Sequence, residues 1–185
     1  MTQAQLTVLA GPTAVGKGTV VAALTRRYPQ LRVSVSATTR APRPGEKEGV
    51  HYFFVSPQEF DDMIERGDML EWALVHGTNK YGTPRGPVDE SLNAGVPVLL
   101  EIDLDGARQV RATRPDACFI FLAPPSWEEL ERRLIGRGTE GPEERERRLR
   151  TARTEMEAAS EFDHVVINDD IERTVDELAG LIGLE

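Results

Sequence analysis

The sequence contains few of the residues that a disulfide framework or a metal centre requires. Its one cysteine, Cys118, lies in an apolar run and has no second cysteine to pair with, so we expect a buried thiol. The three histidines, His51, His76 and His164, are far apart and lack the short spacing of zinc ligands. These absences argue against a disulfide-stabilised protein and against a zinc site.

Long apolar runs and an excess of positive charge are also missing. No stretch of the 185 residues is apolar enough to span a membrane, and the N-terminus lacks the pattern of a secretion signal, which predicts a cytoplasmic protein. A net charge of −9 argues against general binding to nucleic acid, which favours a basic surface. With 39% hydrophobic and 29% charged residues, the chain is expected to form one globular domain with a sizeable core and no obligate protein partner.

What the sequence does contain is a phosphate-loop pattern near its start, Gly-Pro-Thr-Ala-Val-Gly-Lys-Gly-Thr. The apolar run 6–10 before it predicts a buried strand, and the helical spacing of Val20, Val21 and Leu24 after it predicts a helix. In that setting glycines let backbone N–H groups approach an anion, the helix N-terminus attracts it, and Lys17 adds a point charge. A glycine-rich turn without a ligand is the alternative, but strand, spacing and lysine together favour phosphate binding. The residues expected to contact the phosphates of a nucleotide are Gly11, Pro12, Thr13, Ala14, Val15, Gly16, Lys17, Gly18 and Thr19.

The end of this pattern differs from that of GTPases and motor ATPases. Those proteins follow the lysine with Ser or Thr, whose hydroxyl binds Mg²⁺, whereas here Gly18 follows Lys17 and Thr19 comes one place later. The ending resembles that of nucleoside monophosphate kinases. We therefore expect Mg²⁺ to be held mainly by phosphates and water, with no side-chain metal ligand from the protein.

The rest of the chain predicts alternating strands and helices with two excursions. Strands are expected at 6–10, 31–35, 50–55, 69–75, 96–103, 117–122 and 164–168, and loops at 37–45 and 77–84. Helices are expected after the phosphate loop, after the capping boxes that begin at Ser56 and Ser126, and at 88–94, 104–113 and 171–182. The fold class is therefore α/β, a doubly wound phosphate-loop core with a parallel sheet. The expected boundaries are about 1–35, 88–124 and 156–185 for the core, 36–87 for an inserted β-rich lobe and 125–155 for a charged helical segment.

Charged residues outside the phosphate loop give weaker indications. Arg40 and Arg43 lie three apart on a proline-containing loop and are candidates for a phosphate clamp, although two solvated charges are the ordinary alternative. Glu71 lies inside an apolar strand, where an outward-facing carboxylate is the ordinary alternative. Eight arginines between 132 and 153 are interleaved with glutamates, which is typical of a solvated, salt-bridged helix.

Several short segments follow one another in a specific order. They are Gly11 to Thr19; Ser36 to Arg40 with Arg43, Gly45, Glu46, Gly49 and Tyr52; Leu70 to Trp72; Tyr81 to Thr83; Leu100 to Asp103 with Gly106; Arg133 with 136–138; Arg148; and Asn168 to Asp170. In this order they resemble guanylate kinase, the family that phosphorylates GMP with ATP, over nearly the whole chain. Any one segment could occur by chance, but the ordered set is specific.

The resemblance implies which residues bind the acceptor nucleotide. The side chains expected to hold the phosphate of GMP or dGMP are Arg40, Arg43, Tyr52 and Tyr81. Glu71, with Ser36 and Thr83, is expected to read guanine, because a carboxylate accepts hydrogen bonds from the adjacent N1–H and N2–H₂ groups of that base. Glu101 and Asp103 are expected beside the phosphate loop, with Asp103 the one that holds substrate or Mg²⁺ through water.

The same resemblance implies a donor site for ATP and a role for a helical lid at 125–155. The arginines expected to close over the ATP phosphates are Arg133, Arg137 and Arg148, and the residue expected at the adenine is Asn168. Lys17 and Arg40 are expected to act on the phosphoryl group together with these arginines. The phosphate of GMP is mostly anionic at neutral pH, with a second pKa of about 6, so direct in-line transfer needs no general base.

Three other functions stay open at this point. A GTPase is suggested by Asp103-Leu-Asp-Gly106 and by Asn79-Lys80, but no Asp follows two places after Lys80. A peptide-binding domain of the kind that scaffold proteins carry is a second alternative, although such domains have lost parts of the phosphate loop and adjoin other domains, for which this chain leaves no room. A kinase for another nucleoside monophosphate is the third, and Glu71 with Ser36 and Thr83 favours guanine over it.

Overall fold

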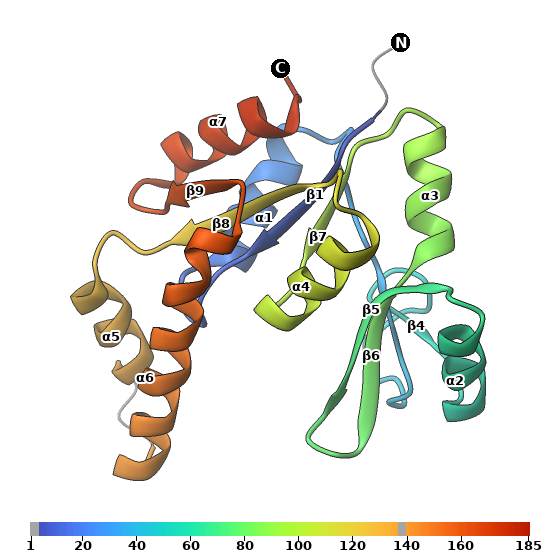
Figure 1. The fold of residues 1–185 in the computed structure, drawn as a ribbon, viewed down its shortest axis with the longest axis horizontal. Helices are drawn as coiled ribbons and strands as arrows, with labels where there is room; N and C mark the ends of the chain where they lie inside the picture. Colours follow the sequence, from blue (N-terminus) through green and yellow to red (C-terminus); the bar gives the residue numbers. More distant parts are fainter. Residues whose placement is uncertain (1–3, 137–139) are drawn as a thin grey trace.

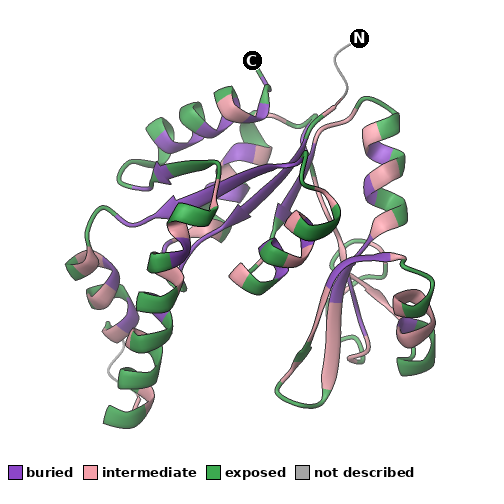
Figure 2. Cartoon of the chain, viewed as in Figure 1, coloured by how far each residue is buried: buried purple, intermediate pink, exposed green. Residues whose placement is uncertain are grey.

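The larger of two β-sheets carries the phosphate loop. The computed structural model describes residues 4–136 and 140–185, and within them this sheet has five parallel strands in the order β2-β7-β1-β8-β9 (Figure 1). The strands are β1 (Leu6–Ala10), β2 (Arg32–Val33), β7 (Val98–Glu101), β8 (Cys118–Ala123) and β9 (His164–Ile167). Every residue of β1 and β8 is buried, as expected for central strands covered on both faces (Figure 2).

Helices cover both faces of the large sheet. They are α1 (Lys17–Arg27), α3 (Arg85–Asn93), α4 (Leu104–Thr113) and α7 (Ile171–Ile182). Leu9 of β1 packs in one apolar cluster with residues of α1 and α7, including Leu178, while its neighbour Val8 packs with residues of α3 and α4, including Val110. Because side chains alternate along a strand, consecutive residues of β1 enter opposite layers. The doubly wound parallel core predicted from the sequence is confirmed.

The smaller sheet lies beside the carboxyl end of the large one (Figure 1). Its strand order is β4-β3-β6-β5, and its elements are β3 (Ser36–Thr38), β4 (Tyr52–Phe54), α2 (Pro57–Glu65), β5 (Met69–Val75) and β6 (Asn79–Pro84). The capping box of Ser56 and Glu59 begins α2 as predicted, and Phe60 of that helix is fully buried against the sheet.

Two segments of the smaller sheet were expected to be loops but are strands. Ala37 and Thr38 belong to β3, and most of 77–84 forms β6, which pairs antiparallel with both β3 and β5. The glycines and prolines at these places predict turns, but pairing between segments about forty residues apart supplies backbone hydrogen bonds that local signals do not reveal. The correction matters because β6 carries two of the candidate site residues, Tyr81 and Thr83.

The charged helical segment forms two helices, α5 (Trp127–Ile135) and α6 (Pro142–Glu157), followed by the short helix η1 (Ala158–Glu161). Leu130, Leu134 and Ala152 form a small apolar cluster between α5 and α6. Figure 1 shows these two helices projecting from the large sheet on the side away from the smaller sheet. Among the described helices, none has the length and apolar character needed to cross a membrane.

Candidate functional site

The phosphate loop, residues 11–19, begins where the central strand β1 ends, with β7 and β8 on either side. This is the switch point in strand order where doubly wound sheets bind ligands. A Cβ on Gly11 would lie 2.5 Å from the carbonyl oxygen of Leu122, so glycine is required for the loop to pack on β8. Gly16 caps α1 with a left-handed φ of 97°, which turns the chain from the loop into the helix.

Lys17, the first residue of α1, is folded back on the loop. Its Nζ donates to the carbonyl oxygen of Gly11 at 2.9 Å. Burial lowers the pKa of Lys17, and the nearby carboxylates of Glu155, Glu101 and Asp103 oppose that shift. The ammonium therefore lies at the loop with carboxylates from other elements around it. A phosphate could replace its present acceptor, the carbonyl oxygen of Gly11.

Two of the predicted donor-site residues meet at one carbonyl of the loop. Asn168, which follows β9, donates from Nδ2 to the carbonyl oxygen of Val15 at 2.8 Å, and Arg133 of α5 donates to the same oxygen from Nη1 at 3.3 Å. Arg148 instead pairs on α6 with Glu144, at 3.5 Å, and with Glu140. The predicted Arg137 lies outside the described residues. The contacts of these residues with ATP stay predictions.

The carboxylates of Glu101 and Asp103 lie at the end of β7 and the start of α4. Asp103 is the N-cap of α4, and its Oδ1 accepts a hydrogen bond from the backbone N–H of Gly106 at 2.8 Å. The Asp-x-x-Gly spacing that suggested a GTPase is thus the spacing of a helix cap. A hollow of about 330 Å³ between α4 and α6 is lined by Asp103, Asp105, Thr151 and Glu155.

These carboxylates fit a magnesium ion that is bound only partly by protein. Among the residues that the structure describes, no cluster of three His, Cys, Asp or Glu side chains could hold a metal ion by itself. Mg²⁺ usually keeps several waters and binds one or two carboxylates together with substrate phosphates. Glu101 and Asp103, two of the three carboxylates near Lys17, suit this arrangement, and the expectation that Asp103 holds Mg²⁺ through water stays a prediction.

The predicted acceptor-site residues form a row across the smaller sheet. The register pairs Ser36 with Tyr52 and Glu71 with Thr83, and pairing of Ala37 with Gly82 places Ser36 opposite Thr83. Residues directly opposite on neighbouring strands point to the same face of the sheet. Four side chains that are up to 47 positions apart in the sequence, Tyr52, Ser36, Thr83 and Glu71, therefore lie in line on one face.

Glu71 is 9% exposed, so the outward-facing alternative is wrong. Its Oε1 accepts a hydrogen bond from the hydroxyl of Thr83 at 2.7 Å. Burial raises the pKa of Glu71, and that hydrogen bond partly opposes the rise, while the carboxylates of Asp103 and Asp105 add to it. The side-chain amide of Gln109 on α4 bonds to both the N–H and the carbonyl of Trp72, which fixes β5, and with it Glu71, beside the large sheet.

Arg40 is held in place by Glu46, Tyr81 and Tyr52. Its guanidinium makes two hydrogen bonds to the carboxylate of Glu46, at 2.8 and 3.0 Å, and Nε donates to the hydroxyl of Tyr81 at 3.2 Å. The guanidinium also lies over the ring of Tyr52, 5.2 Å from its centre. The backbone N–H of Arg43 donates to Glu46 at 2.7 Å, while the Arg43 side chain is exposed. The Arg40 hydrogen bonds are the main cause that lowers the pKa of Glu46 to about 2.

Sequence reasoning assigned no role to three residues that the structure places in the site. Glu46 neutralises Arg40, Gln109 fixes the strand of Glu71, and Glu155 brings a carboxylate from α6 to Lys17. Glu46 had a signal, since it lies three places after Arg43 in a loop with few other partners. Glu155 had none, because nothing in the sequence distinguishes it from the other glutamates of its helix. Lys80, part of the GTPase-like pair, lies in β6 and forms an ion pair with Asp61 of α2.

Comparison with known proteins finds guanylate kinases both by sequence and by structure. The family model described as guanylate kinase matches residues 3–185. The guanylate kinase of Thermobifida fusca is 60% identical over 178 residues, covering 96% of this chain and 90% of the relative, and that of Streptomyces coelicolor is 59% identical over 177 residues, covering 96% and 89%. A crystal structure of guanylate kinase from Anaplasma phagocytophilum aligns with a TM-score of 0.71 at 33% identity, covering 99% of this chain and 86% of that one.

Proposed function

The chain belongs to the guanylate kinase family, so it is a kinase, and we propose that it transfers the terminal phosphoryl group of ATP directly to GMP. The observation that carries the choice of acceptor is the buried carboxylate of Glu71 in the row of Ser36 and Thr83. An ionised carboxylate only accepts hydrogen bonds, and guanine offers two adjacent donors at N1 and N2. Adenine presents a lone pair at N1, which the same carboxylate repels.

We propose that the phosphate of GMP binds among Arg40, Arg43, Tyr52 and Tyr81. Arg40 and Tyr81 are already joined by a hydrogen bond, and Tyr52 packs on the guanidinium, so these groups need little rearrangement. The phosphate would bind Arg40 together with Glu46, or it would replace Glu46 as the partner of Arg40. The side chain of Arg43 is exposed, so it is free to move and bind the phosphate with its positive charge.

For the donor, we propose that the backbone N–H groups of residues 11–19 and the ammonium of Lys17 bind the phosphates of ATP. Mg²⁺, when bound between phosphates, water and the carboxylates of Glu101 or Asp103, would neutralise charge on the transferring group. Lys17 would exchange its bond to Gly11 for a phosphate oxygen. The protein then mainly positions two polyanions in line and stabilises the charge of the transition state.

The arginines of the lid must change partners to take part. Arg133 and Arg148 are engaged here with Glu129, Glu140 or Glu144, so binding ATP requires each to exchange a carboxylate for phosphate. We propose that 125–155 acts as the lid, 36–87 as the GMP-binding lobe and the remaining residues as the core, and that lid and lobe close to exclude water. Hydrogen exchange with and without an adenosine–guanosine compound joined by phosphates would measure this closing.

The direct test is an ATP assay with GMP, AMP, CMP and UMP as acceptors in parallel. Of the four acceptors, only GMP should support rapid formation of ADP from ATP. ATP without an acceptor should be hydrolysed slowly. Equal rates with AMP would overturn the role of Glu71, and rapid hydrolysis without acceptor would overturn transfer. Use of dGMP and a cytoplasmic location stay predictions.

A further inference from the structure

Asn168 is one of the few polar residues buried in the core of the large sheet, with 8% of its surface exposed. Its backbone N–H donates to the carbonyl of Ala123 at 2.8 Å, which places it beside the end of β8. Its side-chain Nδ2 donates to the carbonyl oxygen of Val15, 153 positions earlier, at 2.8 Å. A carbonyl needs a donor, so this contact fixes which end of the amide faces the loop. The amide is thus bound to the backbone of the loop.

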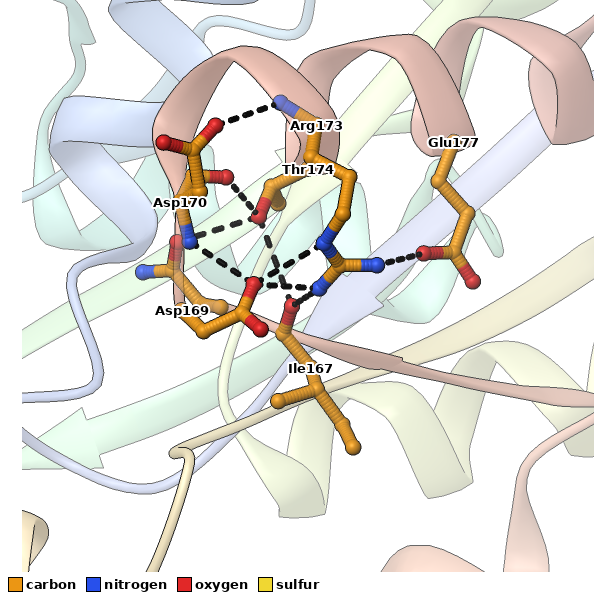
Figure 3. Close-up of polar contacts among 7 residues, drawn as sticks. Ile167, Asp169, Asp170, Arg173, Thr174 and Glu177 are labelled. Carbon is orange, nitrogen blue, oxygen red and sulfur yellow. Dashed lines mark hydrogen bonds and ion pairs between the residues drawn. The ribbon is translucent and has the colours of Figure 1, made fainter.

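The turn that carries Asn168 is itself held firmly. Figure 3 shows Arg173 bound to the carboxylates of Asp169 and Glu177 and to the carbonyl of Ile167, the last at 2.7 Å. Asp170 caps α7 by accepting the N–H of Arg173 at 2.9 Å (Figure 3). Each end of the turn is therefore fixed independently of the phosphate loop, as a support must be if it is to position something else.

Thr174 closes the buried side of this turn. It is fully buried, and its hydroxyl lies among three acceptors, of which the carbonyl of Asp170 is nearest at 2.7 Å and Oδ1 of Asn168 is at 3.3 Å. The Asn168 amide consequently has packed neighbours on the side away from the loop, which restricts its rotation. A rigid donor in a rigid turn faces the carbonyl of Val15.

The geometry of the peptide bond gives this contact a consequence. In a trans peptide the carbonyl and the following N–H point in opposite directions. With the Val15 carbonyl held toward Asn168, the N–H of Gly16 points the other way, away from the β9–α7 turn. The amide also leaves little room for a side chain at Gly16, since a Cβ there would lie 3.0 Å from Nδ2. Rotation of this peptide would turn a carbonyl, which repels phosphate, toward the side that the N–H now faces.

We propose that Asn168 is a positioning residue for the phosphate loop: it holds the Val15–Gly16 peptide so that its N–H can bind a nucleotide phosphate. This inference rests on the proposed function of the loop and replaces the expectation that Asn168 lies at the adenine. Arg133 donates to the same carbonyl at 3.3 Å, but its proposed role requires it to leave for the ATP phosphates. Asn168 is then the donor that stays bound to the Val15 carbonyl. It should therefore strengthen the binding of any ligand with phosphates, whatever base the ligand carries.

The test compares ligands with and without a base. Binding of ADP and of inorganic pyrophosphate is measured by calorimetry on the full chain, for wild type, Asn168→Ala and Asn168→Asp. We expect Asn168→Ala to weaken both ligands by the same factor, about tenfold, the size of a lost hydrogen bond with an unpaired carbonyl left behind. Asn168→Asp keeps the shape without the donor at neutral pH. Its carboxyl group becomes a donor again when protonated, so binding should recover relative to wild type as the pH falls toward about 5.

Asp169→Asn is the matched control, because the amide Oδ1 can still accept the hydrogen bond of Arg173 and so keep the turn, and this residue contacts Arg173 and not the loop; it should bind both ligands like wild type. Loss of ADP binding with unchanged pyrophosphate binding would overturn the proposal and assign Asn168 to the adenine. Unchanged binding of both ligands with a lower Tm would also overturn it, as would Asn168→Asp without pH-dependent recovery, which remains measurable if Asn168→Ala fails to fold. If wild type binds neither ligand, the phosphate loop itself, and with it the proposed function, is wrong.

Discussion

The phosphate loop and the arginine clamp of the smaller sheet would both bind phosphate in the proposed reaction, but they are built from different parts of the chain. The loop is nine consecutive residues after one strand, and its main donors are backbone N–H groups. The clamp joins Arg40, Arg43, Tyr52 and Tyr81 from two strands and a loop, with Glu46 as the partner of Arg40, and its donors are side chains. One site depends on backbone conformation and the other on the packing of a sheet.

Both regions keep negative charge beside their cations. Glu46 occupies Arg40 in the clamp, and Glu155, Glu101 and Asp103 surround Lys17 at the loop. In the proposed reaction, phosphate would replace or join Glu46 at Arg40, and at Lys17 it would enter the field of three carboxylates. We therefore expect the gain on binding in each region to be smaller than for a cation without carboxylates beside it.

The largest expected effect on activity is at Lys17. The phosphate loop has no second basic side chain that could replace it, whereas the clamp has two arginines. Lys17→Ala should lower the rate of transfer by about two to three orders of magnitude, the scale seen when a donor to a developing charge is removed. The Tm should change little, because Lys17 faces the loop. Turnover and melting are measured beside Lys80→Ala, a lysine in the smaller sheet that binds Asp61. Near-normal turnover in Lys17→Ala would remove the loop from the mechanism.

Glu71 should dominate the choice of base. Glu71→Gln keeps the shape but replaces a charged acceptor by an amide, so kcat/KM for GMP should fall. The fall should correspond to a loss of about 2–4 kcal/mol of transition-state stabilisation, the size of a charged hydrogen bond plus an unsatisfied partner. AMP should be affected much less, because repulsion at its N1 disappears. The measurement is kcat/KM for both nucleotides in both proteins. An unchanged preference for GMP over AMP would leave the guanine site without Glu71.

The two regions also differ in how far the sequence predicts them. The phosphate loop is recognisable because its glycines, Lys17, strand and helix are contiguous, and the capped helices and apolar strands of the core follow from local rules of the same kind. The row containing Glu71 depends on β6, which local turn signals at 77–84 conceal. Glu155 acquires its contact with Lys17 only from tertiary packing, so no local pattern distinguishes it from the solvated carboxylates of its helix.

Within the clamp, the two arginines should differ. Arg40→Ala removes the partner of Glu46 and leaves a carboxylate beside the GMP phosphate, whereas Arg43→Ala removes only an exposed charge. We expect the larger loss of GMP affinity for Arg40→Ala, within about 1.5–3 kcal/mol for a charged hydrogen bond, and a smaller one for Arg43→Ala. Titrations with GMP and ADP check this, and ADP affinity should stay near wild type in both.

A double variant sharpens the difference between the arginines. Adding Glu46→Gln to Arg40→Ala removes the stranded carboxylate and should restore part of the GMP affinity. If the double variant binds no better than Arg40→Ala, Glu46 does not compete with phosphate. If Arg40→Ala lowers the affinity for ADP as much as the affinity for GMP, the clamp is not part of the acceptor site.

The smallest expected effect concerns stability, and it compares one carboxylate from each region. The pKa of Glu71 is raised by burial, and so is that of Glu155. A carboxyl group with a raised pKa in the folded state gives its full stability below the pKa of the unfolded chain, and that stability is lost as the pH rises through the folded pKa. Glutamine does not titrate, so Glu71→Gln should be more stable than wild type at pH 7, and the difference should shrink as the pH falls toward about 4.

The two carboxylates should not respond equally, because their neighbours differ. Around Glu71 the nearby charges are the carboxylates of Asp103 and Asp105, which add to the effect of burial, whereas Glu155 lies near the ammonium of Lys17, which opposes it. Glu155→Gln also takes from Lys17 a charge that compensates its burial. Urea unfolding at pH 4 and pH 7 should therefore give the larger pH-dependent gain for Glu71→Gln. An equal gain for Glu155→Gln would mean that Lys17 and Glu155 do not interact, and no gain for Glu71→Gln would mean that the ionised carboxylate is not destabilising in the absence of guanine.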